Sequence, residues 1–315
     1  MVKQMDKNKR LITKKLVQIW GEEARLLKYV DNWRYVEYNK DASAVVFINP
    51  YIKESERIAF FGFIRFPNET ESALWLFKKI SEEAKKLGAT RLVGPLNYST
   101  WFSYRWMTDG WNSVKTWPEP ANEKYMPEFV KQIGFTEYLE YFSSIIPAKD
   151  DEKHKKSKKK YEDALYKGFI FKRYTGMKIK SILNKIYNIS TEVFADKPLY
   201  SPISRVMFKR IYVSAFKKID PVVDLCIYKK KTVGFSFFYE NPYDKDILLW
   251  KTVALKKEYQ GYGLGSAFRY LVHQYAIENN KSYVMQLLMH VESKSKRLIA
   301  DGEIIKKFAL FSKKI

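Results

Sequence analysis

The sequence predicts an α/β (α+β) protein of two domains, each a mixed, mostly antiparallel sheet flanked by helices. Three observations support this fold class. The chain has 315 residues, which suits two domains of about 150 residues better than one. Its 46% hydrophobic and 17% aromatic residues supply apolar surface for two cores. Strands and helices are expected in a similar order on both sides of one charged segment.

The charged segment spans residues 150–160 and contains no apolar residue. A segment of this composition buries little surface, so it indicates a linker or the start of an exposed helix. We therefore predict a first domain at residues 1–150, a charged linker at 151–160 and a second domain at 161–315.

The elements of the first domain follow from short local patterns. Runs of β-branched and aromatic residues at 44–48 and 58–64, bounded by turn residues, predict two paired strands. Apolar residues spaced by three and four over 71–87 predict an amphipathic helix that ends at Gly88. A further strand is expected at 91–96.

The second domain is expected to repeat this order with additional elements. They are a strand at 168–173, two helical stretches between 177 and 218, a hairpin of strands 222–228 and 232–239, a strand at 247–255, a helix at 264–278, a strand at 283–289, a helix at about 293–300 and a strand at 304–311. The two halves share no sequence repeat, but the matching order predicts two copies of one fold.

The net charge of +22 fits partners that are anionic without identifying one. Only 12 of the 57 basic residues are Arg, and a Lys bias of this kind also arises from an AT-rich genome. A solvated basic surface is therefore the simpler interpretation, and a nucleic-acid partner is possible but not favoured.

A single cysteine, Cys226, excludes an intramolecular disulfide, and three scattered His residues do not form a metal site. No segment resembles a signal peptide or reaches the roughly 20 apolar residues that cross a bilayer. We expect a soluble, cytoplasmic protein without a metal, and its oligomeric state stays open.

The most informative segment is the loop between the strand at 247–255 and the helix at 264–278. Its sequence, Gln-Gly-Tyr-Gly-Leu-Gly-Ser at 260–266, lets the backbone approach an anion closely at a helix N-terminus. A turn without a ligand is the alternative for glycines alone. A dinucleotide-binding motif would follow the first strand of its domain, and a phosphate loop of the Walker type would continue with Gly-Lys-Ser/Thr.

In this context the pattern Gln260-x-x-Gly263-x-Gly265 resembles the acyl-coenzyme A signature of the GNAT superfamily of N-acetyltransferases. The resemblance covers about residues 165–313 and implies a GNAT-like fold that uses acetyl-CoA or another acyl-CoA. It implies pantetheine contacts to the backbone of Thr252, Val253 and Leu255. It implies pyrophosphate contacts to Gln260, Gly261, Tyr262, Gly263, Leu264, Gly265 and Ser266.

The sequence departs from the family pattern in the second motif. Ser293 lies near the position of an Asn that touches the cofactor, and Leu298-Ile299 replaces the Tyr that commonly protonates the leaving thiolate. In the first half, residues 122–135 resemble this second motif, but the loop at 66–72 has no glycine and two carboxylates. The first half is therefore expected to be a degenerate copy in a tandem GNAT arrangement.

Candidates for acid and base are the polar residues that follow the strand at 283–289. They are His290, Glu292, Ser293 and Ser295, with Glu240 nearby. His titrates near neutral pH, although a structural His in a satisfied hydrogen bond is the alternative.

An acceptor pocket is expected around 94–106, where turn residues, hydroxyls, aromatic rings and one Arg occur together. An aromatic loop that only packs on a core is the alternative. In a pocket, Arg105 would bind a carboxylate and Glu119 an ammonium group. The expected acceptor-binding residues are Asn97, Tyr98, Arg105, Glu119 and Asn122.

Three functions fit these observations. The leading one is an acyl-CoA-dependent N-acyltransferase, here an N-acetyltransferase, acting on a small amine or an amino acid by direct transfer. The second is an aminoacyl-tRNA-dependent transferase, a class that also joins two such folds. The third is a non-catalytic acyl-CoA sensor or interaction protein, suggested by the missing Tyr.

Overall fold

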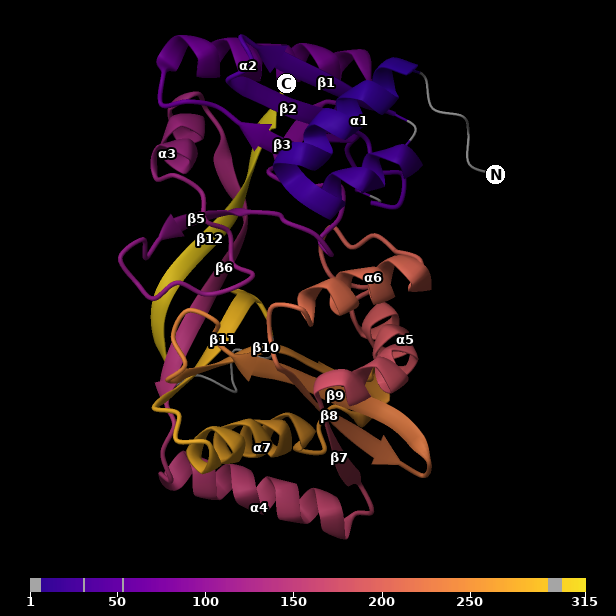
Figure 1. Ribbon diagram of the computed structural model, residues 1–315, viewed down its shortest axis with the longest axis vertical. Helices are drawn as coiled ribbons and strands as arrows, with labels where there is room; N and C mark the ends of the chain where they lie inside the picture. The colour runs from indigo at the N-terminus through magenta and orange to yellow at the C-terminus, as the bar shows by residue number, and fades with distance from the viewer. Residues whose placement is uncertain (1–6, 31, 53, 294–301) are drawn as a thin grey trace.

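The computed structural model describes residues 7–30, 32–52, 54–293 and 302–315, and one twelve-stranded sheet runs through these residues (Figure 1). Its strands lie in the order β1-β2-β3-β4-β12-β6-β11-β10-β9-β8-β7, and β5 pairs with β12 outside this path. The predicted fold class is confirmed, because antiparallel pairs dominate and helices cover the sheet.

The first half begins with two helical elements that the sequence analysis does not assign, and its later strands and helices include the predicted ones. The predicted strands at 44–48, 58–64 and 91–96 and the helix at 71–87 are confirmed. The elements are α1 (Lys7–Trp20), η1 (Gly21–Tyr29), β1 (Trp33–Tyr38), β2 (Ala42–Phe47), β3 (Ile58–Arg65), α2 (Thr70–Lys86), β4 (Arg91–Gly94), β5 (Trp106–Asp109), α3 (Tyr125–Gln132) and β6 (Thr136–Pro147).

The second half agrees closely with its predicted elements, because the strand at 247–255 and the helix at 264–278 have the expected bounds. The helix expected at about 293–300 lies almost wholly outside the described residues. The elements are α4 (Glu152–Tyr166), β7 (Ile170–Thr175), η2 (Gly176–Ile182), α5 (Leu183–Val193), α6 (Arg205–Ala215), β8 (Pro221–Tyr228), β9 (Lys231–Glu240), β10 (Ile247–Leu255), η3 (Lys257–Tyr259), α7 (Leu264–Glu278), β11 (Tyr283–His290) and β12 (Glu303–Lys314).

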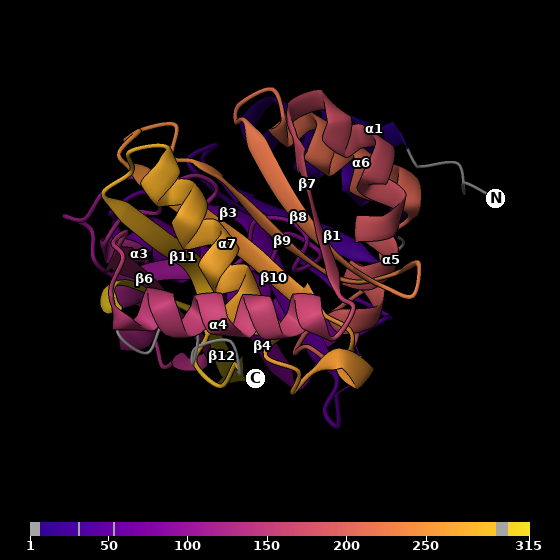
Figure 2. The ribbon, with the colours of Figure 1, turned by 90° about the horizontal axis from the view of Figure 1, so that it is seen from below.

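The charged segment is helical rather than an extended linker. Asp151 caps α4 by accepting a hydrogen bond from the backbone N–H of His154, at 2.8 Å. Only His154, Ser157 and Ala164 are buried in this helix, so most of its charged residues face solvent. Figure 2 shows α4 crossing α7 on one face of the second half. Because so few residues of α4 are buried, the composition of this segment resembles that of a linker.

The two halves exchange their last strands. Strand β12, from the second half, pairs antiparallel with β4 and β6, whereas β6 also pairs antiparallel with β11 of the second half. In Figure 1 the long strands β6 and β12 run side by side from one half to the other. Each half therefore completes the sheet of the other.

Helices on opposite faces of the sheet give each half two cores. In the second half, η2, α5 and α6 pack on one face and α4 and α7 on the other. In the first half, α1 and η1 cover one face, and α2 and α3 cover the other. Elements α1, η1, α5 and α6 leave a space between the halves, which contains the site described below.

A buried ion pair joins the exchanged strands to the loop before α3. Lys306 Nζ on β12 lies 2.7 Å from Glu119 Oε2, and the two side chains are only 6% and 2% exposed. Thr116 and Ser143 donate hydrogen bonds to the same carboxylate. Glu119 thus has its full set of partners within the protein.

Replacing Lys306 with Met should lower the free energy of unfolding by about 3–5 kcal/mol, because it leaves the Glu119 carboxylate buried without its cation. Lys307 is the matched control on the same strand. Its ion pair with Asp109 is exposed, so Lys307→Met should cost less than about 1 kcal/mol. Urea denaturation of both variants measures the difference, and equal costs would contradict the assigned role of Lys306.

Candidate functional site

The site begins where β10 and β11 separate. Their parallel pairing ends at Trp250 and Gln286, and the register of β10 against β9 shifts between Trp250 and Thr252. Lys251 is the residue at this irregularity. Beyond it, the edge of β10 that faces β11 has no strand partner among the described residues. An opening between two parallel strands is therefore present beside Lys251.

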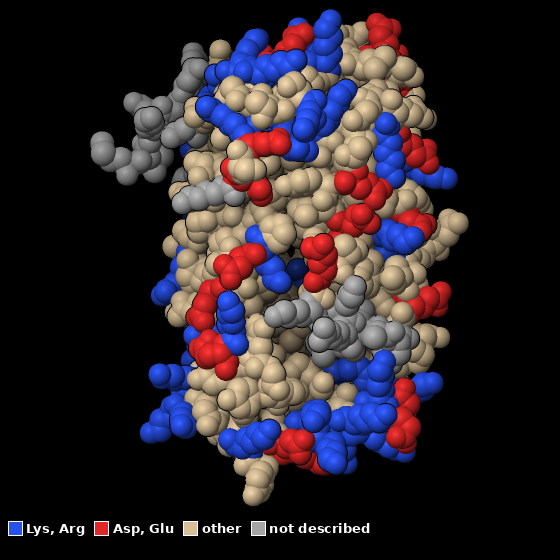
Figure 3. Space-filling model, turned by 180° about the vertical axis from the view of Figure 1, so that it is seen from behind, with Lys and Arg blue, Asp and Glu red and all other residues tan. Residues whose placement is uncertain are grey.

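A cavity of about 1860 Å³ lies between the two halves and includes this opening. It is lined by residues from segments 20–28, 95–106, 117–123, 194–218, 251–253 and 286–293. The face seen in Figure 3 is hollowed near the middle of the molecule, and Lys and Arg gather at both ends of this face, including the end where α4 lies. The cavity is larger than the roughly 300–1,000 Å³ of common ligand sites, so it has room for two reactants.

The glycine loop has the geometry of an anion site. Gly261 and Gly263 have φ of 93° and 78°, in the left-handed region that favours glycine. A Cβ at Gly261 would meet no atom within 4 Å, whereas one at Gly263 would lie 3.1 Å from Cδ of Lys160 on α4. The amides of Leu264, Gly265 and Ser266 belong to the first turn of α7, where no intrahelical acceptor is available.

The loop can accommodate a pyrophosphate, because the space in front of Gly261 is open and the first-turn amides favour negative charge. The Lys160 side chain lies beside Gly263, and its ammonium is 3.8 Å from the Asp163 carboxylate. The Gln260 side chain donates to the backbone oxygen of Leu255 at 3.3 Å, which holds the loop against the end of β10. Thr252 and Val253 line the cavity, but residues 260–266 do not. The loop thus lies outside the cavity lining, and strand β10 extends from the cavity toward the loop.

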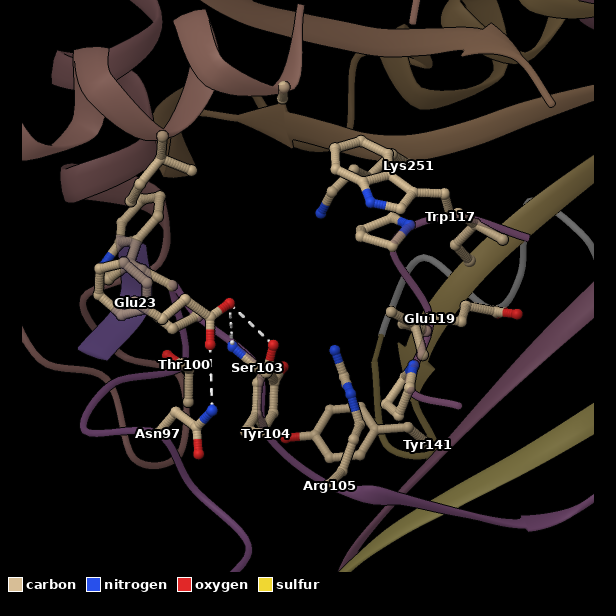
Figure 4. Close-up of a pocket in the computed structure, with 18 of the residues that line it drawn as sticks. Glu23, Asn97, Thr100, Ser103, Tyr104, Arg105, Trp117, Glu119, Tyr141 and Lys251 are labelled. Atoms are coloured by element: carbon tan, nitrogen blue, oxygen red, sulfur yellow. Dashed lines mark hydrogen bonds between the residues drawn. The ribbon is translucent and has the colours of Figure 1, made fainter. Parts of the chain in front are cut away.

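Lys251 is a residue that the sequence analysis misses. Burial, with a further contribution from the charge of Arg105, lowers the pKa of Lys251 to about 8. In Figure 4 its amine points into the cavity, toward the side where Arg105 lies. The signal was present in the sequence, because Lys251 is a single cation within the apolar strand 247–255.

Arg105 is held in an unusual position beneath Lys251. Its φ is 66°, and its guanidinium lies over the rings of Tyr104 and Tyr141, with centroid distances of 3.8 and 4.2 Å. The residue is only 7% exposed, and its Nε and Nη1 atoms have no hydrogen-bond partner among the described residues. Figure 4 shows the guanidinium directed into the cavity.

His290 and its neighbours lie on the same cavity wall. The backbone N–H of Glu292 donates to Nδ1 of His290 at 3.3 Å, and the Tyr141 ring lies 5.2 Å from the His290 ring. Burial lowers the pKa of His290, which favours the neutral form of the ring. Ser293 also lines the cavity. The predicted Ser295 lies outside the described residues.

Two of the remaining predicted acceptor residues have structural contacts. Asn97 accepts from the backbone N–H of Phe63 at 2.6 Å and donates to Glu23 at 3.0 Å. Asn122 accepts from the backbone N–H of Met107 at 2.6 Å. Both residues line the cavity while holding its wall in place.

Tyr98 and Glu119 do not offer the predicted contacts. The Tyr98 ring lies 5.8 Å from the Phe47 ring and is not part of the cavity lining. The Glu119 carboxylate points away from the cavity in Figure 4 and is already paired with Lys306. Glu23, which the sequence analysis does not identify, accepts from Ser103 and Asn97 within the lining.

The corresponding loop of the first half is filled by side chains. Phe66 is buried and contacts the rings of Phe77, Tyr125 and Phe129. The Tyr125 hydroxyl donates to the backbone oxygen of Phe66 at 2.6 Å. The first turn of α2 also carries the carboxylate of Glu71, which opposes an anion.

The described residues contain no group of three or more His, Cys, Asp or Glu residues that could hold a metal ion. No helix in that part of the chain is long and apolar enough to span a membrane.

Comparison with solved structures finds similar folds at low sequence identity. A tandem GNAT protein from the clavulanic acid biosynthesis pathway is 8% identical, with a TM-score of 0.52 and coverage of 98% of this chain and 94% of that chain. A GCN5-related N-acetyltransferase from Anabaena variabilis is 9% identical, with a TM-score of 0.51 and coverage of 99% and 71%.

A third similar structure is the glucosamine N-acetyltransferase region of a fungal multi-domain β-N-acetylglucosaminidase. It is 10% identical, with a TM-score of 0.51 and coverage of 98% of this chain and 37% of that chain. No protein-family model matches the chain, and no curated protein matches it. At such identities the likeness concerns the fold alone, and the fold of this chain is similar to that of the tandem GNAT protein and of the GCN5-related N-acetyltransferase.

Proposed function

We propose that this protein is an N-acyltransferase that moves an acyl group from acyl-CoA to an amine bound in the cavity between the halves. The observation that carries the proposal is the path along β10, from the glycine loop through Thr252 and Val253 to Lys251 at the separation of β10 and β11. Acyl-CoA supplies an activated thioester, and the protein supplies position and proton transfer.

The second half holds the acyl donor. The amides of Gly261 through Ser266 and the Lys160 ammonium bind the pyrophosphate. The space beside Gly261, where an added Cβ would meet no atom within 4 Å, leaves room for it. The unpaired edge of β10 at Thr252 and Val253 offers backbone groups to the pantetheine arm. The first half does not bind a second acyl-CoA, because Phe66 and its aromatic neighbours fill the equivalent loop.

Lys251 is the acid that replaces the missing Tyr. Its ammonium donates a proton to the departing thiolate as the carbon–sulfur bond breaks and the new carbon–nitrogen bond forms. The neutral Lys251 amine then takes the proton that the acceptor nitrogen loses, so the enzyme ends in its starting state. A pKa of about 8 suits both transfers, because it lies near the working pH.

His290 serves as a hydrogen-bond donor. Its Nδ1 accepts from the Glu292 amide, so the proton of the neutral ring lies on Nε2. A neutral donor polarises a carbonyl oxygen without adding a further charge beside Lys251 and Arg105.

Ser266→Glu should abolish acetyl-CoA binding while preserving the fold. A carboxylate in the first turn of α7 is favourable for the helix but repels a pyrophosphate at the same amides. Calorimetry should show a loss of at least about 100-fold in affinity. The control Asn279→Asp adds the same charge at the far end of the helix and should bind as wild type does.

Equal affinity of Ser266→Glu and wild type would show that the loop is not the acyl-CoA site. A folded wild type that binds no acetyl-CoA would contradict the proposed function and favour aminoacyl-tRNA as the donor. Binding without turnover on a panel of amines would favour the acyl-CoA sensor.

A further inference from the structure

Two cations face one cavity without a carboxylate between them. Arg105 is more than nine-tenths buried, and none of the ion pairs among the described residues includes it. In addition to burial, its positive charge lowers the pKa of both Lys251 and His290. Burying charges of like sign together is unfavourable unless an anion offsets them. The site is therefore electrostatically incomplete.

The acidic side chains that line the cavity do not supply this anion. Glu119 pairs with Lys306 and points away, and Glu23 is bonded to Asn97 and Ser103. The other acidic lining residues, Glu123, Asp196 and Glu292, are exposed. Among the acidic lining residues that the structure describes, none is paired with Arg105, and the anion of a ligand can take this place.

We propose that the acceptor is a carboxylate-bearing amine, with its carboxylate on the Arg105 guanidinium and its amine beside Lys251. The proposal rests on the proposed function, which places the acyl group at Lys251. The Arg105 guanidinium lies over two rings that are nearly perpendicular to each other, and a guanidinium binds a planar carboxylate through two N–H groups. Because Arg105 faces Lys251, the amine and the carboxylate are only a few bonds apart in the acceptor, as in an α-amino acid or a close homologue.

The structure also explains why recognition depends on the carboxylate rather than on the ammonium group. The predicted ammonium partner, Glu119, is neutralised, and the cation nearest the proposed amine is Lys251. This positive surrounding favours the neutral, reactive form of the acceptor amine. The Arg105 and Lys251 cations therefore bind the acceptor carboxylate and also keep the acceptor nitrogen neutral for attack.

The test measures binding without acetyl-CoA. The probe is a mixture of N-acetyl α-amino acids, which carry the carboxylate of the expected product, and the comparison is the matched mixture of their carboxamides. Saturation-transfer NMR should show binding of the acids, with signals at least tenfold weaker for the carboxamides. Arg105→Gln should remove the signal, and Arg105→Lys should weaken it because it retains the charge without the planar fork.

Arg210→Gln is the matched control, because Arg210 also lines the cavity but is exposed. It should bind the acids as wild type does. Equal signals from acids and carboxamides, no signal from the acids, or undiminished binding by folded Arg105→Gln and Arg105→Lys would each overturn the proposal. Binding of phosphoethanolamine in place of the acids would overturn it in favour of a phosphate.

The outcome is separable from that of the acyl-CoA test. Binding of the acids with no acetyl-CoA binding would overturn the proposed donor and retain Arg105 as a carboxylate site. Acetyl-CoA binding without binding of the acids would retain the donor site and overturn the acceptor class.

Discussion

Lys251→Met should lower kcat for acyl transfer by about 100- to 10,000-fold, the range expected when a general acid is removed. Met fills a similar volume, so the opening between β10 and β11 and the KM for acetyl-CoA should change little. The measurement is release of the CoA thiol with an amine acceptor present. Lys217→Met is the control, because Lys217 also lines the cavity but is exposed.

The pH profile distinguishes an acid from a structural cation. The protonated form of Lys251 is lost as pH rises through its pKa of about 8, so wild-type kcat/KM should fall above that pH. This decrease should be absent in the residual activity of Lys251→Met. A variant with wild-type kcat, or one that keeps the same decrease above pH 8, would contradict the assigned role.

Residues 1–150 expressed alone should fail to fold, although they contain most of the first half. Strand β12 lies between β4 and β6 and contributes Phe308 and Leu310 to one core and Ala309 and Phe311 to the other. Each large buried side chain contributes about 3–5 kcal/mol, so their joint loss exceeds much of the usual stability of about 5–15 kcal/mol.

Co-expression of residues 1–150 with residues 151–315 is the control. The two fragments should purify as a one-to-one complex, because each supplies the last strand of the other's sheet. Circular dichroism and urea denaturation measure the result. A cooperative unfolding transition in residues 1–150 alone would show that the exchanged strand is not needed.

Local patterns predict the strand and the helix on either side of the glycine loop. The glycines of 260–266, the strand before them and the helix after them have the expected positions, because turn chemistry and apolar spacing act over a few residues. The same reasoning predicts no strand at 136–147. In the structure these residues form β6, in which Ser143, Ser144 and Ile146 are buried.

Contacts between distant residues could not be predicted in this way. Lys306 and Glu119 are 187 positions apart, so no local pattern shows that Glu119 is already paired. The exchange of β6 and β12 likewise depends on pairing across the whole chain. Lys251 is a different case, because a lone cation in an apolar strand is visible in the sequence, although the strand pattern does not distinguish a functional cation from a structural one.

Hydrogen–deuterium exchange with and without acetyl-CoA tests the central claim, that only the second half binds the acyl donor, next to the cavity shared by both halves. The account predicts slower exchange at residues 251–266 when acetyl-CoA is present and no change at residues 66–72, where aromatic side chains fill the loop. Protection at 66–72, or no protection at 251–266 under saturating acetyl-CoA, would contradict it.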